Sequence, residues 1–225
     1  WINGAKSNII RSCVLSAAIY GGVYSDGGKG NSVENSVLIA DSSGAINVVP
    51  GAVSNIVGCI LIGRYGSAQN GGESGRRNIF SPSLAMHPTY ETLQDFQRFN
   101  TNWVNNTVAD PKFVNAGALD FHLLSPAGYV TNWGGWVTNP AVGYSPAIDY
   151  GAQSASVGAE PNPNGGRVNI GLYGGTAEAS KSKTNAWLFA MTFNDGGTLA
   201  QTGRTEWEGG NLGGGATVDL QFSTN

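Results

Sequence analysis

The sequence predicts an all-β protein whose larger part is a parallel β-solenoid. Three observations support this prediction: an internal repeat, a charged content of only 12%, and 34 glycines among 225 residues. Few charges together with abundant Gly, Asn, Ser and Thr favour short strands joined by tight turns over helices. An internal repeat of about 20 to 50 residues is typical of proteins that stack one coil on the next.

The repeat is found by aligning residues 10–15, 33–38 and 56–61, which recur every 23 residues without gaps. Its first and sixth positions are apolar in every copy and are expected to face the core. The second position is mostly charged and is expected to face solvent. The fifth position is expected to face outward or into a partner layer. The first position holds Ile10, Val33 and Ile56, and the sixth holds Leu15, Leu38 and Leu61. The second position holds Arg11, Glu34 and Val57, and the fifth holds Val14, Val37 and Ile60.

The third position of the repeat holds Ser12, Asn35 and Gly58. Asn and Gly tolerate left-handed backbone angles better than other residues. We therefore expect Asn35 and Gly58 to form a tight bend between two strands.

The fourth position holds Cys13, Ser36 and Cys59, and these two cysteines are the only ones in the sequence. Neighbouring strands lie ~4.8 Å apart, so cysteines two strands apart should have Cα atoms separated by ~9.6 Å. A disulfide requires less than about 7 Å. We predict two reduced, buried thiols that fill the core, with Ser36 between them.

The repeat, with the phrases VENSVLIA and GGVY, resembles secreted bacterial right-handed parallel β-helix repeat proteins of the pectate-lyase-like superfamily. Residues 110–129, 145–151 and 165–182 resemble closing rungs of such proteins. The resemblance implies a right-handed parallel β-helix over residues 1–182. It implies little about activity, because this superfamily contains lyases, hydrolases, adhesins and non-enzymatic surface proteins.

A long excursion from the repeat is expected at about residues 64–109. Within it, Leu93, Phe96 and Phe99 have roughly helical spacing and predict a short helix packed on the flank of the solenoid. Loops of this length in compact domains are often functional.

In the closing segment, His122 lies between Phe121 and Leu123 and is expected to point outward, because alternate strand residues face opposite sides. Arg167 is expected to pair with Asp149 or Glu160 and to fix the last long loop. The weaker alternative is a Ca²⁺ site formed by Asp149 and Glu160; no other cofactor is expected.

Residues 183–225 resemble the opening strands of an immunoglobulin-like or fibronectin-like module. Strand-like pieces are found at 187–193, 204–207 and 217–222. A complete sandwich needs about seven strands and ~100 residues. We therefore expect only a partial β-sandwich in this segment.

Five residues are candidates for contact with a carbohydrate. Indoles stack on sugar rings, but the pair of tryptophans in NWGGWVT could instead cap the end of the solenoid or form an interface. The remaining candidates lie in the excursion, where they could line a saccharide cleft. The five residues are Arg76, His87, Tyr90, Trp133 and Trp136.

The sequence favours a non-enzymatic, extracellular structural or adhesive segment of a larger bacterial protein. A net charge of −3 gives no footprint for nucleic acid, and no apolar run reaches the ~18 residues of a membrane helix. Asp26, Glu34 and Asp41 do not share one column, as the stacked carboxylates of a lyase would. The alternative is a carbohydrate-active enzyme, either a polysaccharide lyase or a glycoside hydrolase, or a glycan-binding module, with a polysaccharide as partner.

The chain begins at Trp1 without an initiator Met or signal peptide and reads as an internal piece of a longer precursor. Both ends are expected to expose strand edges and apolar surface, which folded monomers avoid. We expect either a head-to-tail filament contact that covers these edges or a fragment cut from a longer chain.

Overall fold

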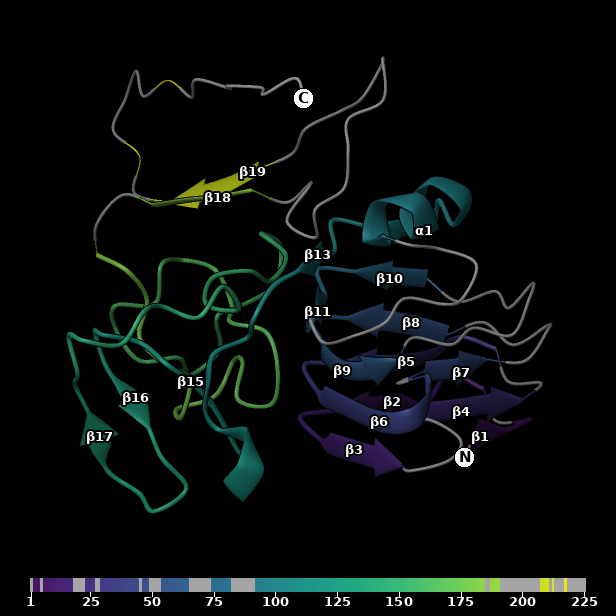
Figure 1. The fold of residues 1–225 in the computed structure, drawn as a ribbon, viewed down its shortest axis with the longest axis horizontal. Helices are drawn as coiled ribbons and strands as arrows, with labels where there is room; N and C mark the ends of the chain where they lie inside the picture. The colour runs from purple at the N-terminus through teal and green to yellow at the C-terminus, as the bar shows by residue number, and fades with distance from the viewer. Residues whose placement is uncertain are drawn as a thin grey trace.

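The computed structural model of the protein describes residues 2–4, 6–17, 23–26, 29–44, 46–48, 54–64, 74–81, 92–184, 187–190 and 207–210, with residues 212 and 217. In this described part the fold is mostly strand, with one α-helix and one 3-10 helix. Figure 1 shows the strands of the N-terminal half stacked on one another and the later residues beside them.

Two five-stranded parallel sheets and one three-stranded parallel sheet form the N-terminal half (Figure 1). Sheet 1 has the strand order β12-β10-β8-β5-β2, sheet 2 has the order β13-β11-β9-β6-β3, and sheet 3 has the order β1-β4-β7. Their bounds are β2 (Ile9–Arg11), β5 (Asn31–Glu34), β8 (Ser54–Val57), β10 (Ser74–Arg76) and β12 (Trp103–Val104); β3 (Val14–Ala17), β6 (Val37–Gly44), β9 (Ile60–Arg64), β11 (Ile79–Phe80) and β13 (Thr107–Val108); β1 (Ile2–Asn3), β4 (Val23–Asp26) and β7 (Ile46–Val48).

The strand register confirms the predicted repeat. Val33 pairs with both Ile10 and Ile56 in sheet 1. Leu38 pairs with both Leu15 and Leu61 in sheet 2. The predicted inward positions are buried at Val33, Ile56, Leu38 and Leu61, which belong to one apolar cluster inside the stack.

The bend between sheets 1 and 2 recurs with left-handed backbone angles. The φ angles are 43° at Asn35 and 64° at Gly58, as expected from the sequence. Ser12, Arg77 and Asn105 have φ angles of 52°, 56° and 54° after strands β2, β10 and β12. The same bend therefore follows every strand of sheet 1.

The segment at about 64–109 contains four strands that the prediction of one excursion missed. Strand β10 pairs with β8 and β12, and β11 pairs with β9 and β13, all in parallel. The predicted helix is present as α1 (Leu93–Phe99), capped by the Thr92 side chain, which accepts a hydrogen bond from the Asp95 N–H. Phe96 packs edge-on against Trp103, with ring centroids 5.4 Å apart.

The side chains at the fourth repeat position, which follows the bend, form a row of hydrogen bonds along the stack, the polar ladder. The Ser36 hydroxyl accepts a hydrogen bond from the Cys13 N–H, and Asn78 Oδ1 accepts one from the Cys59 N–H. Asn106 Oδ1 in turn accepts hydrogen bonds from both the main-chain and side-chain N–H groups of Asn78. Both cysteines are free thiols, as predicted. Cys59 is buried, but Cys13 is only half-buried, because it lies beside the edge strands β2 and β3.

Residues 110–182 form a layer packed on the outer side of sheet 2. Val37, Ile60 and Ile79 share one apolar cluster with residues of this layer, such as Ile148 and Ile170, so the fifth repeat position faces a partner layer. The strands of this layer pair antiparallel and do not extend the parallel sheets, contrary to the expected closing rungs. They are β14 (Phe113–Asn115), β15 (Asp120–Leu123), β16 (Tyr129–Val130) and β17 (Trp136–Val137), with the 3-10 helix η1 (Ala116–Ala118).

The described part of the tail is one antiparallel pair, β18 (Trp187–Ala190) with β19 (Trp207–Gly210). The third strand-like piece, at 217–222, lies outside the described residues except for Thr217. Among the described helices, none has the length and apolar character needed to cross a bilayer.

Candidate functional site

A groove of about 500 Å³ runs along the bends between sheets 1 and 2. Its floor follows the positive-φ positions Ser12, Asn35, Gly58 and Arg77, and its opposite wall comes from residues 151–158 and 174–176 of the outer layer. Because successive strands lie ~4.8 Å apart, these four positions span ~14 Å. The groove is therefore long enough for an extended ligand and within the usual ~300–1,000 Å³ of ligand sites.

The polar groups of the groove come mainly from the outward repeat positions. Arg11 and Glu34 form a two-point ion pair in which Arg11 Nε and Nη2 both contact Glu34 Oε2. Further along the groove, Arg77 lies over the ring of Tyr150, 5.9 Å from its centroid. The side chain of Asn35 lies against the floor, since a Cβ at Gly58 would be 2.5 Å from Asn35 Oδ1.

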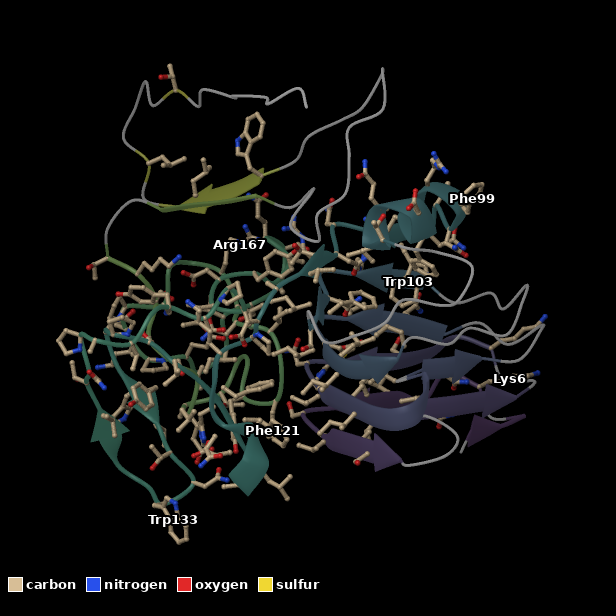
Figure 2. All side chains as sticks on the ribbon, in the orientation of Figure 1. Lys6, Phe99, Trp103, Phe121, Trp133 and Arg167 are labelled. Carbon is tan, nitrogen blue, oxygen red and sulfur yellow. The ribbon has the colours of Figure 1, made fainter. Side chains whose placement is uncertain are left out.

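The hairpin of β16 and β17 carries the two candidate tryptophans. Trp133 is 92% exposed at its tip, next to Gly134 and Gly135, which have φ angles of 80° and 82°. Figure 2 shows Trp133 pointing away from the rest of the molecule. Trp136 is half-exposed and its ring contacts Lys181, with Nζ 4.8 Å from the centroid. The interpretation as a core cap is therefore wrong for Trp133, which remains available to a ligand or partner.

Asp149 and Glu160 are both buried within the outer layer. Glu160 Oε1 accepts main-chain hydrogen bonds from Asn169 and Gly175, whereas Oε2 is buried without a partner. Asp149 Oδ1 accepts a hydrogen bond from the Ser182 hydroxyl. Burial raises the pKa of Asp149 to about 6. Burial, together with repulsion from Asp149, raises the pKa of Glu160 to about 7.

Arg167 contacts the main chain that follows Asp149. Its guanidinium donates to the main-chain carbonyls of Tyr150 and Gly151. Its charge also partly offsets the rise in the pKa of Asp149. In the described part of the chain, no group of three or more His, Cys, Asp or Glu side chains is arranged to hold a metal ion. In that part of the chain, Asp149 and Glu160 therefore have no third side chain of these types with which to bind Ca²⁺.

His122 is buried, and the prediction that it points outward is wrong. All four residues of β15 are buried, because this strand lies between the core of the outer layer and the segment that contains Tyr173. Its Nδ1 lies 2.7 Å from Asp120 Oδ1, and its ring stacks on Tyr173 with centroids 3.7 Å apart.

Of the other carbohydrate candidates, the structure describes Arg76. Arg76 is exposed on β10, but Arg77 lines the groove. His87 and Tyr90 lie outside the described residues. Sequence reasoning missed Arg11 and Glu34 as groove residues, although it placed both in the outward column beside the bends.

Comparisons with protein-family models, with curated proteins and with solved structures give no match.

Proposed function

We propose that the chain is a non-enzymatic, extracellular structural or adhesive segment of a secreted or surface protein of bacteria, built on a right-handed parallel β-helix. The proposal is supported by three parallel sheets whose strands stack in a common register. Such a stack presents a long surface in which equivalent side chains repeat every ~4.8 Å. A surface of this kind suits a structural spacer or an adhesive contact.

The hydrogen bonds of three buried acidic side chains support the non-enzymatic part of the proposal. Asp120, Asp149 and Glu160 each accept hydrogen bonds that hold loops of the outer layer. Lyases need acidic groups stacked beside a basic residue, and hydrolases need two carboxylates facing across a substrate. Among the described residues that line the groove, Glu34 is the one carboxylate, and it is paired with Arg11.

An activity screen tests this proposal. The purified chain is incubated with polygalacturonate, alginate and neutral glucans, with and without Ca²⁺, and unsaturated products and new reducing ends are measured. We expect no product above that of heat-denatured protein. Product formation that is lost in Glu34→Gln or Glu160→Gln would show that the chain is an enzyme.

A glycan-binding module is the second candidate, supported by the groove and by the exposed indole of Trp133. Exposed aromatic rings stack on sugars, and the groove offers amide and guanidinium groups for hydroxyls. Binding of oligosaccharides is measured by calorimetry on wild type, Asn35→Ala and Trp133→Ala. Loss in Asn35→Ala alone assigns binding to the groove, loss in Trp133→Ala alone assigns it to the hairpin, and no binding by wild type rejects this candidate.

Head-to-tail self-association is part of the main proposal. The edge strands β2 and β3 carry Ile9 and Val14, which are 61% and 38% exposed. Each of these strands pairs with one neighbour among the described strands. Exposed edges of parallel sheets are templates for another strand, and a contact between opposite ends of the stack would build a filament.

A further inference from the structure

The side chain of His122 has a buried nitrogen atom without a partner. His122 is 2% exposed, and its Nε2 atom makes no hydrogen bond. A buried polar atom left in this way is energetically unfavourable, because it has lost its hydrogen bonds to water. Such atoms in folded proteins often mark a site that an ion or a water occupies.

Asp120 fixes which nitrogen of the imidazole carries the proton. Asp120 Oδ1 lies 2.7 Å from His122 Nδ1 and also accepts the His122 main-chain N–H. The other oxygen, Oδ2, accepts the main-chain N–H of Asn132. The carboxylate acts as an acceptor in all three contacts, so Nδ1 carries a proton, and in the neutral imidazole the lone pair is then on Nε2. The same carboxylate–histidine arrangement orients histidines that bind metal ions.

A second donor atom faces the lone pair of His122. Glu178 Oε2 lies 3.7 Å from Nε2, beyond the ~3.2 Å limit of a good hydrogen bond. Two ligands that each lie ~2.0–2.1 Å from one zinc ion are separated by ~3.3 Å in ideal tetrahedral geometry and by more when the angle opens. The Glu178 side chain is 60% exposed, which leaves one side open to solvent.

The surroundings of the imidazole favour a cation. The ring of Tyr173 lies parallel to the imidazole, with an angle of 5° between the planes. Two carboxylates, those of Asp120 and Glu178, also lie within 3.7 Å of the ring nitrogens and supply negative charge at the site.

We propose that His122 Nε2 and Glu178 Oε2 bind a divalent transition-metal ion of the zinc class, with Asp120 as the positioning residue and water completing the coordination. A mixed nitrogen and oxygen ligand set suits Zn²⁺, Ni²⁺ or Cu²⁺ better than Ca²⁺ or Mg²⁺. The bound ion would fasten the segment around Glu178 to strand β15. This site is separate from Asp149 and Glu160 and does not depend on the function proposed above.

Calorimetric titration of the whole chain with ZnCl₂ tests the site, after treatment with a chelator and its removal. We expect one saturable site in wild type and at least tenfold weaker binding in both Glu178→Gln and His122→Gln. Glu178 is exposed, so its variant should fold normally. His87→Gln and Cys13→Ser are the matched controls, because they remove the other histidine and the half-buried thiol, and both should bind zinc as wild type does.

A nitrogen-resolved NMR spectrum of the imidazole gives a readout that folding alone does not move. We expect the Nε2 resonance of His122 to shift on addition of zinc while Nδ1 stays protonated. Equal zinc binding by wild type and Glu178→Gln, no saturable binding at millimolar zinc, or an Nε2–H signal that persists with zinc present would overturn the proposal.

Discussion

The main-chain N–H of Gly171 donates a hydrogen bond to the carbonyl of Gly58 over 2.9 Å. This bond joins the outer layer directly to the bend between sheets 1 and 2. Gly171 also packs on the end of the Ile60 side chain, since a Cβ there would lie 2.8 Å from Ile60 Cδ1. The outer layer is thus fixed to the floor of the groove at Gly58, which lines the groove.

Replacement of Gly58 should destabilise the fold through this junction. Gly58 has a φ of 64°, and an added Cβ would lie 2.5 Å from Asn35 Oδ1 and 3.4 Å from Ile170. We expect Gly58→Ala to lower the free energy of unfolding by about 1–3 kcal/mol, measured by urea titration. Gly134→Ala is the control, because its φ is 80° but a Cβ would meet no atom within 4 Å. Equal losses in both variants would show that backbone strain alone acts.

The bend column shows why part of this fold can be predicted from the sequence. Ile10, Val33 and Ile56 recur at a fixed interval, so their pairing follows from periodicity alone. Asn35 and Gly58 fill the bend with residue types that accept positive φ. Leu93 and Phe96 similarly predict α1 from their spacing.

The later strands escape prediction because the interval changes. Asn78 lies 19 residues after its ladder partner Cys59, and Asn106 lies 28 residues after Asn78. A search at a fixed period therefore misses both. The residues of the polar ladder could have identified these later strands. Asparagine occupies there the fourth repeat position, which cysteine and serine hold in the earlier copies.

The positions of the site residues in the outer layer could not be predicted from the sequence, for a different reason. Strict alternation assigns His122 to solvent, but both faces of β15 are covered, so alternation carries no information on exposure there. Likewise, the wall of the groove comes from residues 151–158, whose position depends on packing far along the chain.

The two thiols should differ in reactivity. Burial raises the pKa of the Cys59 thiol to about 12, and this side chain is fully buried. Cys13 is half-buried. We expect a thiol reagent near pH 8 to modify at most one cysteine in native protein and both in urea. The Cys13→Ser variant should then be unreactive until it unfolds, and an oxidised pair in native protein would contradict the register of the strands.

Two tryptophans provide a matched test of core and surface. Trp103 is 2% exposed and packs against Phe96 and Phe80, whereas Trp133 is 92% exposed. We expect Trp103→Ala to lower the free energy of unfolding by about 3–5 kcal/mol and Trp133→Ala to change it by less than about 0.5 kcal/mol. Acrylamide should quench the fluorescence of Trp133 strongly. A large stability loss in Trp133→Ala would mean that the hairpin tip is buried in solution.

Stability should fall as the pH rises from about 4.5 to 7. The pKa of Glu160 in the folded protein is about 7, raised from an ordinary 4.5, and that of Asp149 is about 6, raised from 3.8. The folded state therefore holds protons that the unfolded state releases, so their contribution is present below the ordinary pKa values and is lost by about pH 7. For Glu160 this contribution is on the order of 3 kcal/mol.

Urea titrations of wild type and Glu160→Gln across this pH range isolate the effect. The glutamine keeps an oxygen acceptor for the N–H groups of Asn169 and Gly175 but carries no charge. We expect the variant to lose less stability than wild type between pH 4.5 and 7. Parallel curves for the two proteins would show that Glu160 titrates normally.

Self-association should depend on the exposed edge at β2 and β3. Ile9 is 61% exposed on β2, and helix α1 lies near the other end of the same stack (Figure 1). Head-to-tail contact would bury Ile9 against that end, and a charged side chain there would have to be desolvated without a partner. In sedimentation at rising concentration, we expect the mass of wild type to increase and that of Ile9→Lys to stay monomeric. Leu119→Lys, which changes a 67% exposed leucine of the outer layer, should behave as wild type. A constant monomer mass for wild type, or equal association of the two lysine variants, would show that the edge strands do not mediate assembly.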